Sequence, residues 1–130
     1  MSESRLEELD GESFDKVTSL CESLVVVMFY TNSCPNCKAI APIYRKIASE
    51  LKDIARLTIV NAELHQEIAM RYGVMAVPTF KFFCHGNAIG EIVGGVNRTI
   101  LRNTIRDFAS YRFNCVSKSS KVIYEMTGYA

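Results

Sequence analysis

The chain has 130 residues, of which 48% are hydrophobic and 22% charged, and its net charge is +1 at pH 7. Such a length and composition predict one globular domain with a substantial hydrophobic core. The mixed charges exclude the basic footprint of a nucleic-acid-binding protein, and the longest apolar run, Leu24 to Tyr30, is too short to cross a membrane. We therefore expect neither nucleic acid nor a membrane among its partners.

The cysteine content bears on the compartment. The chain has five cysteines, and its polar, acidic residues 1–10 lack the pattern of a signal peptide. An odd number of cysteines without an export signal disfavours a framework of structural disulfides and favours a reducing environment. We expect a cytoplasmic protein with one redox-active pair and three further thiols, Cys21, Cys84 and Cys115.

The first half of the chain predicts strands and helices in alternation. The expected strands are residues 5–9, Leu24 to Tyr30 and Ala55 to Val60, and the expected helices run from Asp10 or Gly11 to Cys21 and from Cys34 to Leu51. The continuous apolar run of the second strand is typical of a strand buried on both faces. The apolar residues of the helices recur at helical spacing.

The second half predicts a short helix, a hairpin and a last helix. The expected elements are a helix from Leu64 to Tyr72, strands from Thr79 to Cys84 and from Ala88 to Val93, and a helix that Asn97 caps, with Ile100, Leu101, Ile105 and Phe108 on its buried face. The alternation predicts an α/β fold with right-handed crossovers. We expect a domain over residues 1–110 and a C-terminal extension over 111–130, which could be a hairpin, an arm or a frayed tail.

The most informative motif is Cys34-Pro35-Asn36-Cys37, at the junction of a predicted strand and a predicted helix. The first turn of a helix supplies free N–H groups and the positive end of a dipole, which favour a thiolate. With Cys34 as N-cap, Pro35 takes the first helical position, where a missing N–H costs nothing. Cys34 is then the nucleophile, and Cys37 resolves the mixed disulfide.

Other interpretations of the two cysteines are an inert pair or a metal site. Zinc requires a complete set of ligands, and His65 and His85 are the only histidines. Neither histidine lies at a spacing from the cysteines that completes such a site. We therefore expect no metal and no bound cofactor.

A second motif is Val77-Pro78-Thr79, which directly precedes a predicted strand. A proline at this place is either an ordinary trans residue at a strand edge or the site of a cis peptide bond. A cis bond beside the dithiol would turn the Val77 backbone outward, where its N–H and C=O could pair with an extended substrate.

Together these residues resemble thioredoxin, without gaps from about Phe14 to Phe108. The resemblance is carried by Phe29-Tyr30, the Cys34–Cys37 pair, Pro42, Val77-Pro78-Thr79, Gly86 and Gly94. It implies a central mixed five-stranded sheet flanked by four helices, a cis bond at Pro78, Cys34 as attacking thiolate and Cys37 as buried resolving thiol. It also implies a substrate groove around Ser33, Pro35, Asn36, Val77, Pro78, Val93 and Gly94.

Several positions depart from the family pattern. Ser33 replaces the usual tryptophan, and Pro35-Asn36 replaces Gly-Pro between the cysteines. Met28 replaces a buried aspartate that, in the resembling family, takes a proton from the second cysteine, and Ile59 replaces a nearby lysine. Resolution by Cys37 is therefore expected to be slow near neutral pH unless water reaches it.

The expected function is the reduction of protein disulfides through a redox-active Cys34–Cys37 disulfide. The expected partners are disulfide-bearing target proteins and an upstream thioredoxin reductase or similar electron donor, and the expected state is a monomer. Two alternatives stay open. Pro35 is closer to glutaredoxins, so the donor could be glutathione, or the fold could serve as a redox-inactive docking module.

Overall fold

A computed structural model of the chain describes residues 6–20 and 23–110. The described strands are β1 (Glu7–Glu8), β2 (Leu24–Tyr30), β3 (Ala55–Asn61), β4 (Thr79–Cys84) and β5 (Asn87–Val93). The described helices are α1 (Gly11–Leu20), α2 (Pro35–Glu50), α3 (Gln66–Arg71) and α4 (Arg98–Ser110). Their order is the one that the sequence predicts.

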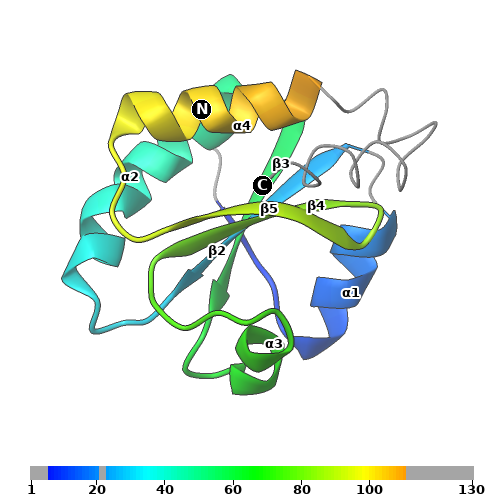
Figure 1. The fold of residues 1–130 in the computed structure, drawn as a ribbon, viewed down its shortest axis with the longest axis vertical. Helices are drawn as coiled ribbons and strands as arrows, with labels where there is room; N and C mark the ends of the chain where they lie inside the picture. The colour runs from blue at the N-terminus through cyan, green and yellow to red at the C-terminus, as the bar shows by residue number, and fades with distance from the viewer. Residues whose placement is uncertain (1–5, 21–22, 111–130) are drawn as a thin grey trace, which may run out of the picture.

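The strands form one five-stranded mixed sheet in the order β1-β3-β2-β4-β5 (Figure 1). Strands β1, β3 and β2 are parallel, whereas β4 is antiparallel to β2 and β5 is antiparallel to β4. β2 is the central strand, and six of its seven residues are buried. The predicted α/β fold with a mixed sheet is therefore confirmed.

Two helices cover each face of the sheet (Figure 1). On one face, α2 and α4 pack on alternate residues of β2 and β4, including Val26, Met28 and Phe80. On the other face, α1 and α3 pack on the intervening residues, including Val27 and Phe29. Because both faces are covered, the strand β2 is apolar throughout, as expected for a strand between two helical layers.

Side chains at the helix ends account for where the outer helices begin. The Asp10 carboxylate accepts hydrogen bonds from the N–H groups of Glu12 and Ser13 at 3.0 and 2.8 Å and caps α1. The Asn97 side chain accepts from the N–H of Ile100 at 2.8 Å and caps α4. Both residues satisfy N–H groups that a helix start leaves unpaired.

Strands β2 and β5 end, and strand β4 begins, at the same end of the sheet. Phe29, near the end of β2, is the register partner of Thr79 at the start of β4. Thr79 in turn faces Val93 at the end of β5. The sheet thus brings together the segment after β2, the loop before β4 and the residues after β5, which contain both motifs of the sequence.

The structure corrects several details of the prediction. Ile100 is 51% exposed and does not belong to the buried face of α4, whereas Leu101 and Ile105 are fully buried. Helix α3 is shorter than predicted and is followed by Gly73, whose φ of +68° favours glycine. Cys21, Cys115 and the predicted extension 111–130 lie outside the described residues, so the proposed domain boundary stays a prediction.

Candidate redox site

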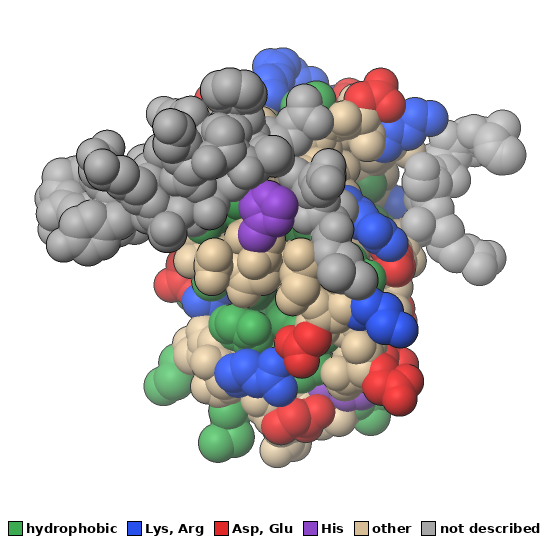
Figure 2. Space-filling model, turned by 90° about the vertical axis from the view of Figure 1, so that its right-hand side faces the viewer, with side chains coloured by type: hydrophobic (Ala, Val, Ile, Leu, Met, Phe, Trp, Pro, Cys, Tyr) green, Lys and Arg blue, Asp and Glu red, His purple; other side chains and the backbone are tan. Residues whose placement is uncertain are grey.

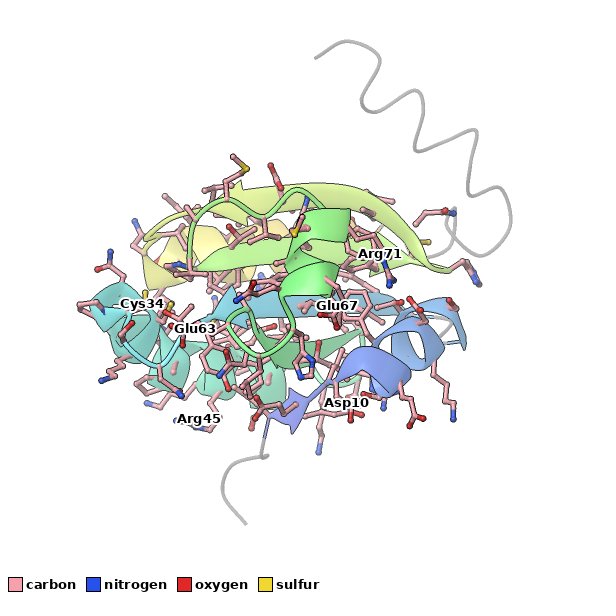
Figure 3. All side chains as sticks on the ribbon, turned by 90° about the horizontal axis from the view of Figure 1, so that it is seen from below. Asp10, Cys34, Arg45, Glu63, Glu67 and Arg71 are labelled. Carbon is pink, nitrogen blue, oxygen red and sulfur yellow. The ribbon has the colours of Figure 1, made fainter. Side chains whose placement is uncertain are left out.

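Cys34 lies where the chain passes from β2 into α2 (Figure 3). It is the N-cap of α2, with φ −87° and ψ 112°, and Pro35 occupies the start of the helix. The N–H of Cys37 donates a hydrogen bond to the Cys34 sulfur at 3.1 Å. The predicted capping arrangement is therefore confirmed, and it directs a helix N–H group at the sulfur that the sequence identifies as the nucleophile.

Cys37 lies one helical turn further on and is the more covered of the two thiols. It is 3% exposed, compared with 8% for Cys34, and both cysteines are free thiols. The pKa of the Cys37 thiol is raised to about 11, first by burial and then by the hydrogen bond to Cys34 and the charge of Cys34, whereas a hydrogen bond to the Thr31 backbone opposes the shift. Cys37 is thus protonated near neutral pH.

The Val77–Pro78 peptide bond is cis, as the resemblance implies. The carbonyl oxygen of Val77 lies 3.7 Å from the Cys34 sulfur, to which it is linked by a weak S–H hydrogen bond. The Thr79 hydroxyl donates to the Ala76 carbonyl at 2.6 Å, and the Gly94 N–H donates to the Pro78 carbonyl at 2.8 Å. These bonds fix the loop against β4 and the end of β5, beside the dithiol.

The remaining residues of the predicted groove surround this contact. Val93 is 55% exposed, and Gly94, with φ +89°, joins it to the Pro78 loop through its N–H. Ser33, Pro35 and Asn36 are exposed next to the buried Cys34 and Cys37. The structure therefore brings the loop, the end of β5 and the dithiol together, and it leaves the segment around Cys34 open to an approaching chain.

A cavity of about 220 Å³ lies beside Cys37. Its lining residues are Leu6, Met28, Tyr30, Thr31, Asn32, Cys37, Lys38, Ala41, Arg45 and Ile59. Met28 and Ile59, the departures that the sequence analysis identified, are register partners on β2 and β3 and both line it. Because Asn32 and Lys38 are exposed, the cavity is continuous with solvent, and water has a route to the resolving thiol.

Tyr30 and Glu8 form a polar pair at this cavity that sequence reasoning missed. Tyr30 lines the cavity, and its hydroxyl donates to the Glu8 carboxylate at 2.6 Å. Burial and the neighbouring carboxylate raise the pKa of Tyr30 to about 12. The hydroxyl therefore stays protonated and polar. No local pattern could reveal this pair, because it joins residues 22 positions apart.

The labelled charged side chains lie on both sides of the molecule in Figure 3. Glu63 and Arg45 lie on the side where Cys34 lies, whereas Arg71 and Asp10 lie toward the other end. Arg71 pairs with Asp15 at 3.0 Å. Within the described residues, no group of three or more His, Cys, Asp or Glu side chains is placed to hold a metal ion. None of the described helices has the length and apolarity needed to cross a membrane.

Cys84, at the end of β4, corrects an expectation. The sequence analysis treats it as one of three further thiols, but it is disulfide-bonded. Cys84 is 1% exposed and packs with the face of the sheet that α2 and α4 cover. An odd number of cysteines therefore does not exclude a disulfide apart from the Cys34–Cys37 pair. The sequence does not show which thiols lie close together in space.

Comparisons with known proteins agree with this geometry. The family model described as thioredoxin matches residues 5–107. A protein disulfide isomerase-like 2-1 of Oryza sativa is 43% identical over 89 residues, which are 67% of this chain and 24% of that protein. Thioredoxin 1 of Synechococcus elongatus is 32% identical over 81 residues, which are 62% of this chain and 76% of that protein.

Solved structures give the same result. A thioredoxin of Malassezia sympodialis superposes with a TM-score of 0.75 at 28% identity, over 81% of this chain and 91% of that one. A mutant thioredoxin of Halobacterium salinarum superposes with a TM-score of 0.71 at 26% identity, over 82% and 96%. The chain spans about a quarter of the length of the disulfide isomerase relatives that it matches. The match over residues 5–107 shows that the chain belongs to the thioredoxin family.

Proposed function

We propose that the chain is a thiol-disulfide oxidoreductase that reduces disulfides of target proteins through Cys34 and Cys37. One observation carries the proposal: the Cys34 sulfur receives the Cys37 N–H at 3.1 Å and lies 3.7 Å from the Val77 carbonyl oxygen. A thiol at a helix start and beside an open backbone edge is placed both to attack a disulfide and to meet a polypeptide. Membership in the thioredoxin family supports the same chemistry.

The proposed reaction has two exchange steps. The Cys34 thiolate attacks one sulfur of a target disulfide, forms a mixed disulfide and releases the other target sulfur as a thiolate. The Cys37 thiolate then attacks the Cys34 sulfur, which closes the Cys34–Cys37 disulfide and releases the second target thiolate. The target gains the electron pair that the dithiol loses, and Cys37 gives its proton to water in the adjacent cavity.

The target polypeptide is proposed to lie across the exposed edge beside Cys34. The Val77 backbone offers a carbonyl and an N–H to an extended chain, which is the usual geometry of strand addition. The proposed contact surface consists of Ser33, Pro35, Asn36, Val77, Val93 and Gly94. Pro78, which the sequence analysis includes in this surface, is buried and lies beneath it. No bound cofactor or metal is required, because the sulfur atoms themselves carry the electrons.

The test is the reduction of a protein disulfide with Cys34→Ser as the control. The wild type is expected to reduce the substrate catalytically when dithiothreitol regenerates it, and Cys34→Ser is expected to lose activity above the rate of dithiothreitol alone. Full activity in Cys34→Ser would contradict the role of Cys34. A wild type without activity on any disulfide would instead favour the redox-inactive docking module.

The proposed electron donor is a thioredoxin reductase or a similar enzyme, and glutathione is the alternative that Pro35 suggests. Oxidised protein incubated with reduced glutathione alone, and separately with a thioredoxin reductase and its reductant, distinguishes the two. Rapid regeneration by glutathione alone would contradict the proposed donor. A cytoplasmic location and a monomeric state stay predictions from the sequence.

The names of the relatives favour a second candidate, disulfide isomerisation. The relative at 43% identity is called protein disulfide isomerase-like. An isomerase acts through the same attack by Cys34, but a second cysteine thiolate of the target then attacks the mixed disulfide, forms a new disulfide within the target and releases the Cys34 thiolate. A slow, protonated Cys37 favours this route, because it leaves time for the target thiolate to react. The gain of native activity by a scrambled, fully oxidised substrate, with Cys37→Ser compared with wild type, measures this route. Isomerisation retained in Cys37→Ser supports it, and its absence in both proteins contradicts it.

A further inference from the structure

The cavity beside Cys37 is apolar on the side that the sheet forms. Met28 and Ile59, the two departures from the family pattern, are register partners on β2 and β3, and both line it. Leu6, just before β1, lines the cavity as well. This wall therefore offers a binding surface to an apolar group and no hydrogen-bonding side chain.

The size of this cavity is that of a small organic molecule. Its volume is about 220 Å³, whereas an apolar cavity of about 150 Å³ holds benzene. The space therefore accommodates one six-membered ring with a short chain. It is separate from the proposed target surface, because Val77 and Val93 do not line it.

Helix α2 forms the opposite wall of the cavity. The residues that it contributes are Cys37, Lys38, Ala41 and Arg45. Successive members are one, three and four residues apart, and residues three and four apart lie on the same face of a helix. Because Ala41 is small, the cavity extends along α2 from Cys37 toward Arg45.

The charge at this cavity favours an anion. Among the described residues that line it, the charged ones, Lys38 and Arg45, are both basic. The Glu8 carboxylate, which accepts from the Tyr30 hydroxyl, does not line it. On the face that carries α1, by contrast, Figure 2 shows acidic and basic side chains intermixed. The planar guanidinium of Arg45 matches a carboxylate in charge and in geometry.

We propose that the cavity beside Cys37 binds a small carboxylate with an apolar body, whose ring lies against Met28 and Ile59 and whose charge pairs with Arg45. Arg45 follows Cys37 by eight residues, about 12 Å along the helix axis. The carboxylate is therefore held at the end of the cavity away from Cys37, and the apolar body points toward the thiol.

A bound carboxylate should slow the resolution of the mixed disulfide. Its apolar body displaces the water to which Cys37 gives its proton, and it brings no base to the thiol in exchange. This consequence rests on the proposed function, whereas the binding itself does not.

Binding is tested on the reduced protein with 3-phenylpropanoate, by NMR titration of the backbone amide signals of α2 and β2. 3-Phenylpropanamide has the same shape without the charge, and acetate has the charge without the ring. Each of these two compounds is expected to bind at least about fivefold more weakly than 3-phenylpropanoate. The absence of 3-phenylpropanoate binding, or equal binding of 3-phenylpropanamide, would overturn the proposal.

Three variants locate the site. Arg45→Gln is expected to weaken the binding of 3-phenylpropanoate about fivefold. Lys46→Gln is the matched control, since Lys46 is the next residue of α2 and is exposed, but does not line this cavity; it should bind as the wild type does. Ala41→Leu fills the cavity and should abolish binding, and urea denaturation checks that it stays folded. An equal loss in Lys46→Gln and Arg45→Gln would overturn the proposed site, since it would reflect the overall charge of α2.

The effect on resolution is measured as the lifetime of the Cys34 mixed disulfide at increasing concentrations of 3-phenylpropanoate. The lifetime should lengthen and level off where binding saturates, and Arg45→Gln should require about fivefold more of the compound. An unchanged or shorter lifetime at saturation would overturn the control of resolution. A wild type that binds 3-phenylpropanoate but reduces no disulfide would support the binding site and contradict the proposed function.

Discussion

At the scale of single residues, the site is defined by the different surroundings of two chemically identical thiols. Cys34 caps a helix and lies beside the Val77 carbonyl, whereas Cys37 is covered and its pKa is raised to about 11. Met28 and Ile59 line the cavity next to Cys37 and offer it no acidic or basic group. The charged groups that line this cavity are Lys38 and Arg45.

The first prediction at this scale concerns pH. Burial raises the pKa of Cys37, so its thiolate becomes more abundant as pH rises. In the mixed disulfide Cys34 no longer carries a thiol, so Cys34 no longer contributes to the raised pKa of Cys37. The burial of Cys37 still raises that pKa. The rate of resolution should therefore increase about tenfold per pH unit above neutrality until it levels off at the Cys37 pKa in that state. Stopped-flow measurement of the lifetime of the mixed disulfide tests this, and a lifetime independent of pH would contradict it.

The second prediction concerns Met28. Met28→Asp places a carboxylate at the cavity beside Cys37, where it can accept the proton that resolution releases. Resolution at pH 7 should become about 100-fold faster, and the free energy of unfolding should fall by about 2–5 kcal/mol, because Met28 is only 2% exposed. Met28→Leu, which keeps the packing without an acid, is the control. Equal lifetimes in both variants would show that position 28 only fills the core.

At the scale of elements, the helices and strands follow from local patterns, and their mutual contacts do not. The bounds of β2 and β4 agree with those expected, because each is an uninterrupted apolar or alternating run between clear breaks.

Tyr44 was not recognised as a core residue, although it is fully buried on α2. Its hydroxyl lies 3.1 Å from the Val26 carbonyl and 2.8 Å from that of Thr58. A tyrosine can be buried in the core when other elements offer its hydroxyl a hydrogen-bond partner. The sequence alone therefore does not show whether Tyr44 is buried or exposed.

This contact gives a prediction for stability. Tyr44→Phe removes a buried hydroxyl between β2 and β3 and leaves the carbonyls with one hydrogen-bond donor fewer. The free energy of unfolding should fall by about 1–3 kcal/mol in urea denaturation. Tyr30→Phe is the matched control. Its hydroxyl bonds to the exposed Glu8, so its loss should cost less than about 1 kcal/mol. A larger loss in Tyr30→Phe than in Tyr44→Phe would contradict the role given to Tyr44.

At the scale of the whole molecule, the fold class and the dithiol were predictable, and the cavities beside it were not. Strand–helix alternation and the two motifs around Cys34 and Pro78 are local signals, and together they resemble one family. The cavity at Cys37 and the groove that Met70 and Met75 border each combine residues from several elements. The sequence does not show that Met70 and Met75 are 79% and 93% exposed, because only the packed chain decides whether an apolar side chain finds a partner. The disulfide at Cys84 was missed for the same reason.

The most direct test of the account is the capture of a mixed disulfide by Cys37→Ser. Without a resolving thiol, the bond between Cys34 and a target sulfur cannot be displaced from within the chain, so it should accumulate with a disulfide-bearing protein substrate. Peptide mapping by mass spectrometry should then find the target cysteine linked to Cys34. A link at Cys84, at a cysteine outside the described residues, or at no cysteine of the chain would contradict the assignment of Cys34 as the attacking thiol.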